Sequence, residues 1–119
     1  MVFAEALREV ARRVEGCVGL VVMGMDGIPI EKLVLDEGIN FEMLATECTT
    51  ILRTTRQASE DVGAGRLHEL IVMTDSLVVL AMTITEDYVL LGALRKNGHY
   101  GRARYVLRKA TLRLAKEFL

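Results

Sequence analysis

The sequence has 119 residues, of which 51% are hydrophobic and 26% charged, and its net charge is −1. This balance excludes a disordered, collagen-like or low-complexity chain, and a nearly neutral chain has no overall attraction for nucleic acid or an anionic membrane. The length suits one domain with its own core, and two cysteines are too few for a disulfide scaffold. The N-terminal residues mix charges with apolar positions, and the apolar runs are shorter than the ~20 residues that span a bilayer. We therefore expect a cytoplasmic protein without membrane insertion.

The first part of the chain predicts a helix followed by a hairpin. Apolar residues at helical spacing predict an amphipathic helix over 2–15, and the valine-rich segment 17–25 predicts a buried strand. Asp26-Gly27 predicts a two-residue turn with positive φ at both positions, followed by a return strand over 28–33. Pro29 has no N–H to donate, which confines the return strand to an edge of the sheet or to a bulge.

A long amphipathic helix is predicted over 40–60, with Asn40 as its N-cap. The residues predicted to face the sheet are Phe41, Leu44, Ala45, Cys48, Ile51, Leu52 and Thr55. The residues predicted on the opposite face are Met43, Thr46, Glu47, Thr50, Arg53, Thr54 and Gln57. Because threonine lowers helix propensity, we expect tertiary or quaternary packing to stabilise this helix.

The second half of the chain predicts three strands and a final helix. The strands are expected over 67–74, 77–84 and 88–94. Tight turns at Asp75-Ser76 and Glu86-Asp87 make consecutive strands antiparallel, and Asn97-Gly98 predicts one more turn before a helix from about residue 100 to the C-terminus. The fold class is therefore α+β with the element order αββαβββα, in which helices cover both faces of an antiparallel sheet.

The third predicted strand is the most informative segment. If the fifth strand lies beside the first, the sheet has the order 2-1-5-4-3 and the third strand is a free edge. The second half of this strand has no proline or lysine to protect it, which favours pairing with a second copy of the chain. The residues predicted at this dimer interface are Leu67, Glu69, Leu70, Ile71, Val72, Met73 and Thr74. The alternative is that a loop or helix of the same chain covers the edge.

No residue pattern indicates a catalytic, cofactor or metal site. Cys17 and Cys48 fall at predicted buried positions, while His68 and His99 are expected at a strand start and in a turn. The glycines at 63–65 follow a helix and precede a strand, whereas a phosphate-binding loop needs the reverse order. We therefore expect a chain that is not an enzyme.

The C-terminal helix is basic and has two interpretations. The positively charged residues that could form a nucleic-acid-binding face are Arg102, Arg104, Arg108, Lys109, Arg113 and Lys116. Against this, stacking aromatics are few, and a solvated basic face also complements the dipole of a helix C-terminus. We favour the solvated face and expect no nucleic-acid partner.

The whole chain resembles the Roadblock/dynein light chain family, especially its bacterial and archaeal members. The resemblance includes the element order, the stretch from Gly19 to Ile30 with its strand, Asp-Gly turn and return strand, and the closing hairpin over 77–84 and 88–94 before a basic helix. It implies a single roadblock-like domain over 1–119, and a homodimer formed by pairing of the third strands with the two long helices side by side. It also implies no catalysis by this chain alone.

Members of that family bind small Ras-like GTPases as regulators, activators or scaffolds, or attach to motor and signalling complexes. Bacterial relatives serve GTPases that set cell polarity and gliding motility. The resemblance implies that the GTPase contacts the long helix, at Met43, Glu47, Thr50, Arg53, Thr54 and Gln57. Arg53 is interpreted as a solvated helix residue and not as an arginine finger. The alternative function is a small-molecule sensor of PAS-like or profilin-like architecture, which requires an internal cavity.

Overall fold

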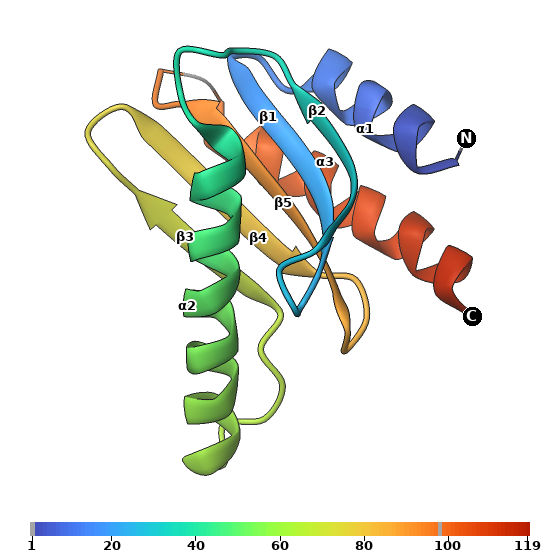
Figure 1. Cartoon of the computed structure of the whole chain (residues 1–119), viewed down its shortest axis with the longest axis vertical. Helices are drawn as coiled ribbons and strands as arrows, with labels where there is room; N and C mark the ends of the chain where they lie inside the picture. Colours follow the sequence, from blue (N-terminus) through green and yellow to red (C-terminus); the bar gives the residue numbers. More distant parts are fainter. Residues whose placement is uncertain (1, 98) are drawn as a thin grey trace.

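The computed structural model describes residues 2–97 and 99–119 and has the predicted order of elements (Figure 1). The helices are α1 (Val2–Arg13), α2 (Phe41–Asp61) and α3 (Tyr100–Ala115), and a 3₁₀ turn, η1 (Lys116–Phe118), follows α3. The strands are β1 (Cys17–Gly24), β2 (Pro29–Val34), β3 (Glu69–Met73), β4 (Leu77–Thr83) and β5 (Tyr88–Arg95). Gly98, the second residue of the predicted Asn97-Gly98 turn, lies outside the described residues.

The five strands form an antiparallel sheet with the order β2-β1-β5-β4-β3, which confirms the predicted topology. β5 lies between β1 and β4, and Gly92 is opposite Leu20 on one side and Leu80 on the other. β2 and β3 form the two edges. Pro29 lies on edge strand β2 opposite Met23, where the register shifts, so its missing N–H falls at an irregular position of the ladder.

Helices cover the two faces of the sheet unequally. α1 and α3 pack side by side on one face, where Leu7 and Leu107 belong to the same buried cluster as Leu80 (Figure 1). α2 alone covers the other face, where Phe41 packs in a cluster with Leu91. The central strands β1, β4 and β5 are therefore buried on both faces, which explains why they lack an alternating polar pattern.

The start of α2 is positioned by a glycine and a cap. A Cβ atom on Gly19 would lie 2.8 Å from the ring of Phe41, so only glycine lets the helix approach β1 this closely. The side chain of Asn40 accepts a hydrogen bond from the N–H of Met43 at 3.1 Å, which confirms the predicted N-cap.

The predicted geometry of the β1-β2 turn is wrong in one respect. Only Gly27 has a positive φ, of 89°, while Asp26 does not. The N–H of Gly27 donates to the carbonyl of Gly24 at 2.9 Å. The N–H of Gly24 donates in turn to the carbonyl of Ile28. These bonds close a three-residue loop, which requires the left-handed conformation at its last residue alone.

The predicted apolar face of α2 also needs correction. Ile51 is 48% exposed and Thr55 is half-buried, whereas Thr49 is fully buried and donates from Oγ1 to the carbonyl of Ala45 at 2.9 Å. The C-terminal end of α2 extends past the strands, and Leu52 is its last buried residue (Figure 1). Helical spacing alone could not show where the sheet ends beneath the helix.

Candidate functional site

The outer edge of β3 is the first candidate surface. β3 pairs with β4 from Glu69 opposite Met82 to Met73 opposite Val78, and no other described strand pairs with it. The strand is shorter than predicted, because Leu67 and His68 precede it and Thr74 belongs to the β3-β4 turn. There the Oγ1 of Thr74 accepts a hydrogen bond from the N–H of Leu77 at 3.0 Å. Backbone groups on the outer edge of β3 are therefore available for pairing.

The predicted interface residues point to both faces of the sheet. Leu67, Leu70 and Val72 pack against the buried cluster on the α2 face. Successive side chains of a strand alternate between faces, so Ile71 and Met73 lie on the α1/α3 face, where they are 36% and 55% exposed. The edge thus carries an apolar row on each side.

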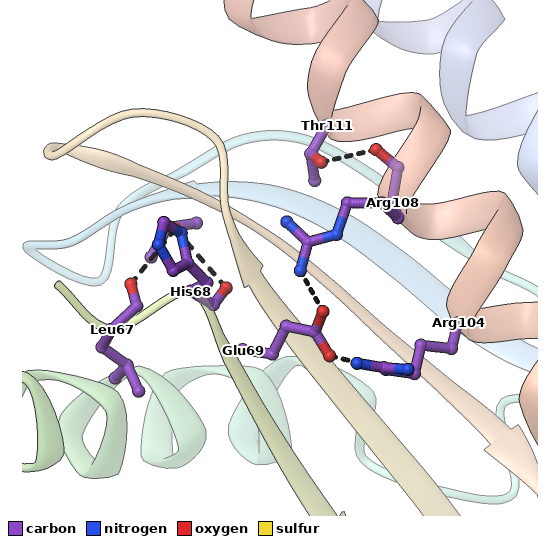
Figure 2. Close-up of polar contacts among 7 residues, drawn as sticks. Leu67, His68, Glu69, Arg104, Arg108 and Thr111 are labelled. Carbon is purple, nitrogen blue, oxygen red and sulfur yellow. Dashed lines mark hydrogen bonds and ion pairs between the residues drawn. The ribbon is translucent and has the colours of Figure 1, made fainter.

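Glu69 differs from its neighbours because its side chain is bound within the chain (Figure 2). Its Oε1 accepts a hydrogen bond from Nε of Arg104 at 2.7 Å, and its Oε2 accepts one from Nη2 of Arg108. The hydrogen bond from Arg104 lowers the pKa of the carboxyl below its usual range, with a further contribution from Arg108. Of the predicted interface residues, Glu69 contributes its backbone to the edge while its side chain is held by α3.

The second candidate surface consists of the six α2 residues predicted to contact a GTPase. We call it the α2 outer face. All six are exposed: Met43, Glu47, Thr50, Arg53, Thr54 and Gln57. The structure therefore places them together on one accessible side of the helix.

The threonines of α2 satisfy their hydroxyls within the helix. Oγ1 of Thr50 donates to the carbonyl of Thr46 at 3.4 Å, and Oγ1 of Thr54 donates to that of Thr50 at 3.2 Å. Thr46 and Thr55 make the same contact with carbonyls four residues earlier. A hydroxyl bound in this way has already donated its proton within the helix, so it can meet a partner protein only as an acceptor.

Two arginines fasten α2 to the hairpin loops at one end of the sheet. Nη1 of Arg53 donates to the carbonyl of Met25 in the β1-β2 loop, and its Nη2 donates to Oγ1 of Thr50 at 3.3 Å. Nη1 of Arg56 donates to the carbonyl of Glu86 in the β4-β5 loop at 2.5 Å. The role of Arg56 was not predicted, since nothing in the sequence identifies a backbone carbonyl 30 residues away as an acceptor.

The described residues hold no group of three or more His, Cys, Asp or Glu side chains that could bind a metal ion. Burial raises the pKa of the Cys17 thiol to about 11 and also raises that of Cys48, so both thiols are protonated at neutral pH. His68 is exposed, as expected for a surface position. These side chains offer no activated nucleophile in the part of the chain that the structure describes.

The two alternative functions find little support in the geometry. Among the basic residues of α3, Arg104 and Arg108 bind Glu69, and Nε of Arg102 donates to the carbonyl of Arg13 at 3.2 Å. Half of the proposed nucleic-acid face is therefore engaged by protein groups. Three hollows formed by described residues have both charged and apolar side chains in their linings, and all three are open to the surface, whereas a sensor would hold its ligand inside the core. No described helix combines the length and apolarity that crossing a membrane requires.

Comparison with solved structures identifies proteins of the same fold. The chain is 30% identical to MglC from Myxococcus xanthus, with a TM-score of 0.71 and coverage of 98% of this chain and 99% of that one. A Roadblock/LC7 domain from Streptomyces avermitilis has a TM-score of 0.84 at 16% identity and coverage of 96% and 95%. A structure of MglB with a tetrameric arrangement has a TM-score of 0.85 at 16% identity and coverage of 95% and 85%.

A search of curated protein sequences found no match. The sequence model of the Roadblock/LC7 domain, however, matches residues 3–94, which is well over half of the chain. The match includes β1 to β4, α2 and β5 up to Leu94, and therefore both candidate surfaces. The chain belongs to the Roadblock/LC7 family.

Proposed function

We propose that the chain acts as a homodimer in which the two β3 edges pair antiparallel and the two α2 helices lie side by side. The unpaired apolar edge supports this arrangement, because β3 has no proline or lysine to prevent pairing. Leu70 and Val72 are only half-buried beside α2, and a second copy would cover them further. Exposed Ile51 lies on α2, where a neighbouring helix would bury it.

We further propose that the paired outer faces of α2 form a platform for a small Ras-like GTPase, and that the chain regulates or scaffolds this GTPase without catalysis of its own. Membership of the Roadblock/LC7 family and similarity to MglB and MglC support this assignment. The observation that carries it is the chemistry of the α2 outer face. It combines exposed Met43 and threonines that are hydrogen-bonded within the helix with the polar side chains of Glu47, Arg53 and Gln57, and such a mixed surface suits contact with another protein.

Arg53 has a positioning role in this proposal. Its guanidinium already donates to Met25 and Thr50 of its own chain. An arginine finger must instead reach the transferring phosphoryl group of the partner. The chain would therefore act by binding one nucleotide state of the GTPase or by ordering the catalytic residues that the GTPase itself supplies.

The test uses the purified chain and a Ras-like GTPase from the same organism, loaded with GDP or with a non-hydrolysable GTP analogue. Analytical ultracentrifugation measures the dimer, and biolayer interferometry measures GTPase binding. We expect a dimer at micromolar concentrations and binding that prefers one nucleotide state. A monomer at tens of micromolar would contradict the dimer, while a dimer that binds neither state of the GTPase would contradict the platform.

A matched pair of variants locates the binding face. Met43 on α2 and Leu112 on α3 are 62% and 64% exposed. Met43→Glu places a charge on the proposed platform and should weaken GTPase binding, whereas Leu112→Glu adds the same charge to a different helix and should leave binding unchanged. Equal effects of the two variants would show that α2 is not the contact surface.

A further inference from the structure

Charge is divided unevenly over the molecule. The helical elements on the sheet face opposite α2, namely α1, α3 and η1, carry nine lysines and arginines against three carboxylates (Figure 1). The rest of the chain carries six lysines and arginines against thirteen carboxylates. We call α1, α3 and η1 together the α1/α3 layer. A chain with a net charge of −1 therefore has one strongly positive side.

Ion pairs neutralise only part of the positive charge of the α1/α3 layer. Glu69 of β3 accepts hydrogen bonds from two arginines of α3, and Glu9 accepts them from two arginines of α1. Each carboxylate thus meets two guanidinium groups, and with Glu69 counted in the layer the cations still outnumber the carboxylates by nine to four. No ion pair among the described residues involves Lys109, Arg113 or Lys116. The unpaired cations therefore include three on α3 and η1.

The exposed side of α3 alternates apolar and basic side chains. Tyr105, Lys109, Leu112 and Lys116 follow one another at spacings of four, three and four residues, which places them in one line along a helix. We call this line the α3 ridge. Its apolar side chains are accessible, since Tyr105 is 61% and Leu112 64% exposed. The core contacts of α3 come from its other side, where Leu107 is buried.

We propose that the α3 ridge adsorbs the chain to the surface of an anionic lipid bilayer. Its lysines would lie among the headgroups, while Tyr105 and Leu112 would reach the boundary between headgroups and acyl chains. The six lysines and arginines of α3 and η1 are a number that gives a helix affinity for anionic lipids. Because the inner side of α3 stays packed on the sheet, the contact is peripheral and reversible, without insertion of the helix.

The α3 ridge is separate from the proposed GTPase platform. α3 and α2 lie on opposite faces of the sheet, so an adsorbed chain would hold the α2 outer face away from the bilayer (Figure 1). If two chains pair as proposed, with their α2 helices side by side, both α3 ridges face the same bilayer. Two linked contacts bind more tightly than one. The proposal itself concerns a surface of the single chain, and the dimer would only strengthen the adsorption.

An anionic bilayer fits the α3 ridge better than other polyanions. A nucleic acid would meet the lysines through its phosphates but would leave exposed Leu112 without a partner. Nζ of Lys109 lies 5.6 Å from the centre of the Tyr105 ring, so one face of this ring is not free to stack on a base. An acidic protein would need a hollow matched to each protruding side chain. A fluid bilayer supplies both acyl chains and mobile negative charges.

Vesicle sedimentation with the full chain tests the proposal. Sucrose-loaded vesicles consist of phosphatidylcholine alone or of phosphatidylcholine mixed with phosphatidylserine. At ~0.1 M salt the chain should sediment with the mixed vesicles and not with the neutral ones, and the bound fraction should fall as salt increases because the charges are screened. Absence of binding to the mixed vesicles, or equal binding to both kinds, would overturn the proposal.

Two variants with the same charge change test the location. Lys109→Glu reverses a charge on the α3 ridge and should weaken binding to the mixed vesicles by about tenfold or more. Arg66→Glu reverses a charge at an exposed residue next to Leu67, which packs on the α2 face, and should change binding by less than about twofold. Circular dichroism verifies that both variants fold. Equal affinities of the two variants would show that the α3 ridge is not the contact.

The apolar part of the ridge separates a bilayer from a nucleic acid. Leu112→Ala leaves the charge unchanged and should weaken binding to the mixed vesicles by about fivefold, because less apolar surface is buried. An unchanged affinity would contradict the proposal, in which Leu112 is part of the contact. A single-stranded oligonucleotide is tested in parallel. If it binds in a Lys109-dependent manner and the mixed vesicles do not bind, the ridge is a nucleic-acid site and the bilayer proposal is wrong.

Met43→Glu distinguishes the α3 ridge from the GTPase platform. This variant should weaken GTPase binding and leave vesicle binding unchanged, whereas Lys109→Glu should have the opposite effects. Vesicle binding by a chain that binds no GTPase would support the α3 ridge and contradict only the platform. Loss of vesicle binding in a folded Met43→Glu chain would place the lipid contact on α2 and overturn the assignment to α3.

Discussion

Oε1 of Glu69 on edge strand β3 accepts a hydrogen bond from Nε of Arg104 on α3 at 2.7 Å, across 35 residues of sequence. Arg108, one turn later on α3, donates to the other oxygen of the same carboxylate (Figure 2). The Glu69 side chain is only 16% exposed, so this is a largely enclosed contact. It fixes the first residue of β3 to α3 while the apolar remainder of the strand stays at the open edge.

The first prediction concerns this contact. Glu69→Gln keeps the shape of the side chain but removes the charge that both arginines bind, so it should lower the Tm at pH 7 by a few degrees. Glu37→Gln, at an exposed loop position, is the control and should leave the Tm within about 1 °C. Scanning calorimetry of the three proteins checks the result, and equal Tm values would mean that the contact contributes nothing to stability.

The same contact predicts a pH dependence with a defined sign. Arg104 and then Arg108 hold the pKa of Glu69 below its usual range in the folded protein, and the unfolded chain lacks these partners. The stabilisation is therefore complete above about pH 5 and is lost as the pH falls through the lowered pKa. The Tm difference between the unmodified protein and Glu69→Gln should shrink between pH 5 and strongly acidic conditions. A difference that stays constant over this range would assign the effect to packing.

The second prediction concerns the proposed dimer interface. Val72→Pro, like Ile71→Pro, removes a backbone donor from β3 and should convert the dimer to monomer or aggregate. Because proline can also unfold the strand, Ile71→Lys is the better test. Ile71 is 36% exposed, and lysine there adds like charges from the two copies to the shared edge. Sedimentation velocity should show weaker dimerisation of a folded Ile71→Lys chain, and a dimer as tight as the unmodified one would contradict the β3 interface.

The third prediction concerns the attachment of α2. Arg53→Ala removes the hydrogen bond that ties α2 to Met25, together with the bond to Thr50 within the helix, so the C-terminal half of the helix should open more readily. Hydrogen exchange of the amides after Leu52 should accelerate, while those near Phe41 should be unchanged. Arg53→Lys retains a donor and should give a smaller increase. If both variants exchange like the unmodified chain, the arginine does not restrain the helix.

The fourth prediction compares two glycines. Gly19→Ala would place a methyl group 2.8 Å from the buried Phe41 ring and should lower the free energy of unfolding by about 1–3 kcal/mol. Gly101→Ala, in the first turn of α3, meets no atom within 4 Å and should raise the stability by about 0.5–1 kcal/mol. Urea denaturation measures both changes, and a stable Gly19→Ala protein would show that Phe41 can move aside.

Local patterns in the sequence were sufficient for most of the fold. Helical periodicity and the turn signals predicted the element order. The short connections made consecutive strands antiparallel, and the confirmed strand order required the further hypothesis that the fifth strand lies beside the first. The errors arose at residues of α2 whose burial depends on the sheet beneath the helix and not on their neighbours in the sequence. Ile51 was placed on the buried face and Thr49 was not, because the line of contact between α2 and the sheet is set by the sheet's own extent.

For the two candidate surfaces as well, local sequence patterns predicted the elements, and tertiary contacts decided the use of individual side chains. The sequence by itself determined that an apolar strand without proline or lysine in its second half and a long helix with a polar face exist in this chain, because helical periodicity and turn chemistry act over a few residues. The tertiary structure decided that this strand is a sheet edge, because β5 lies between β1 and β4. Only the tertiary structure decided how individual side chains are used there. The acceptors of Arg53 and Arg56 are carbonyls 28 and 30 residues away, and Glu69 is bound from a helix 35 residues later. Such partners are chosen by the packing of distant elements in space, and no spacing along the chain encodes them.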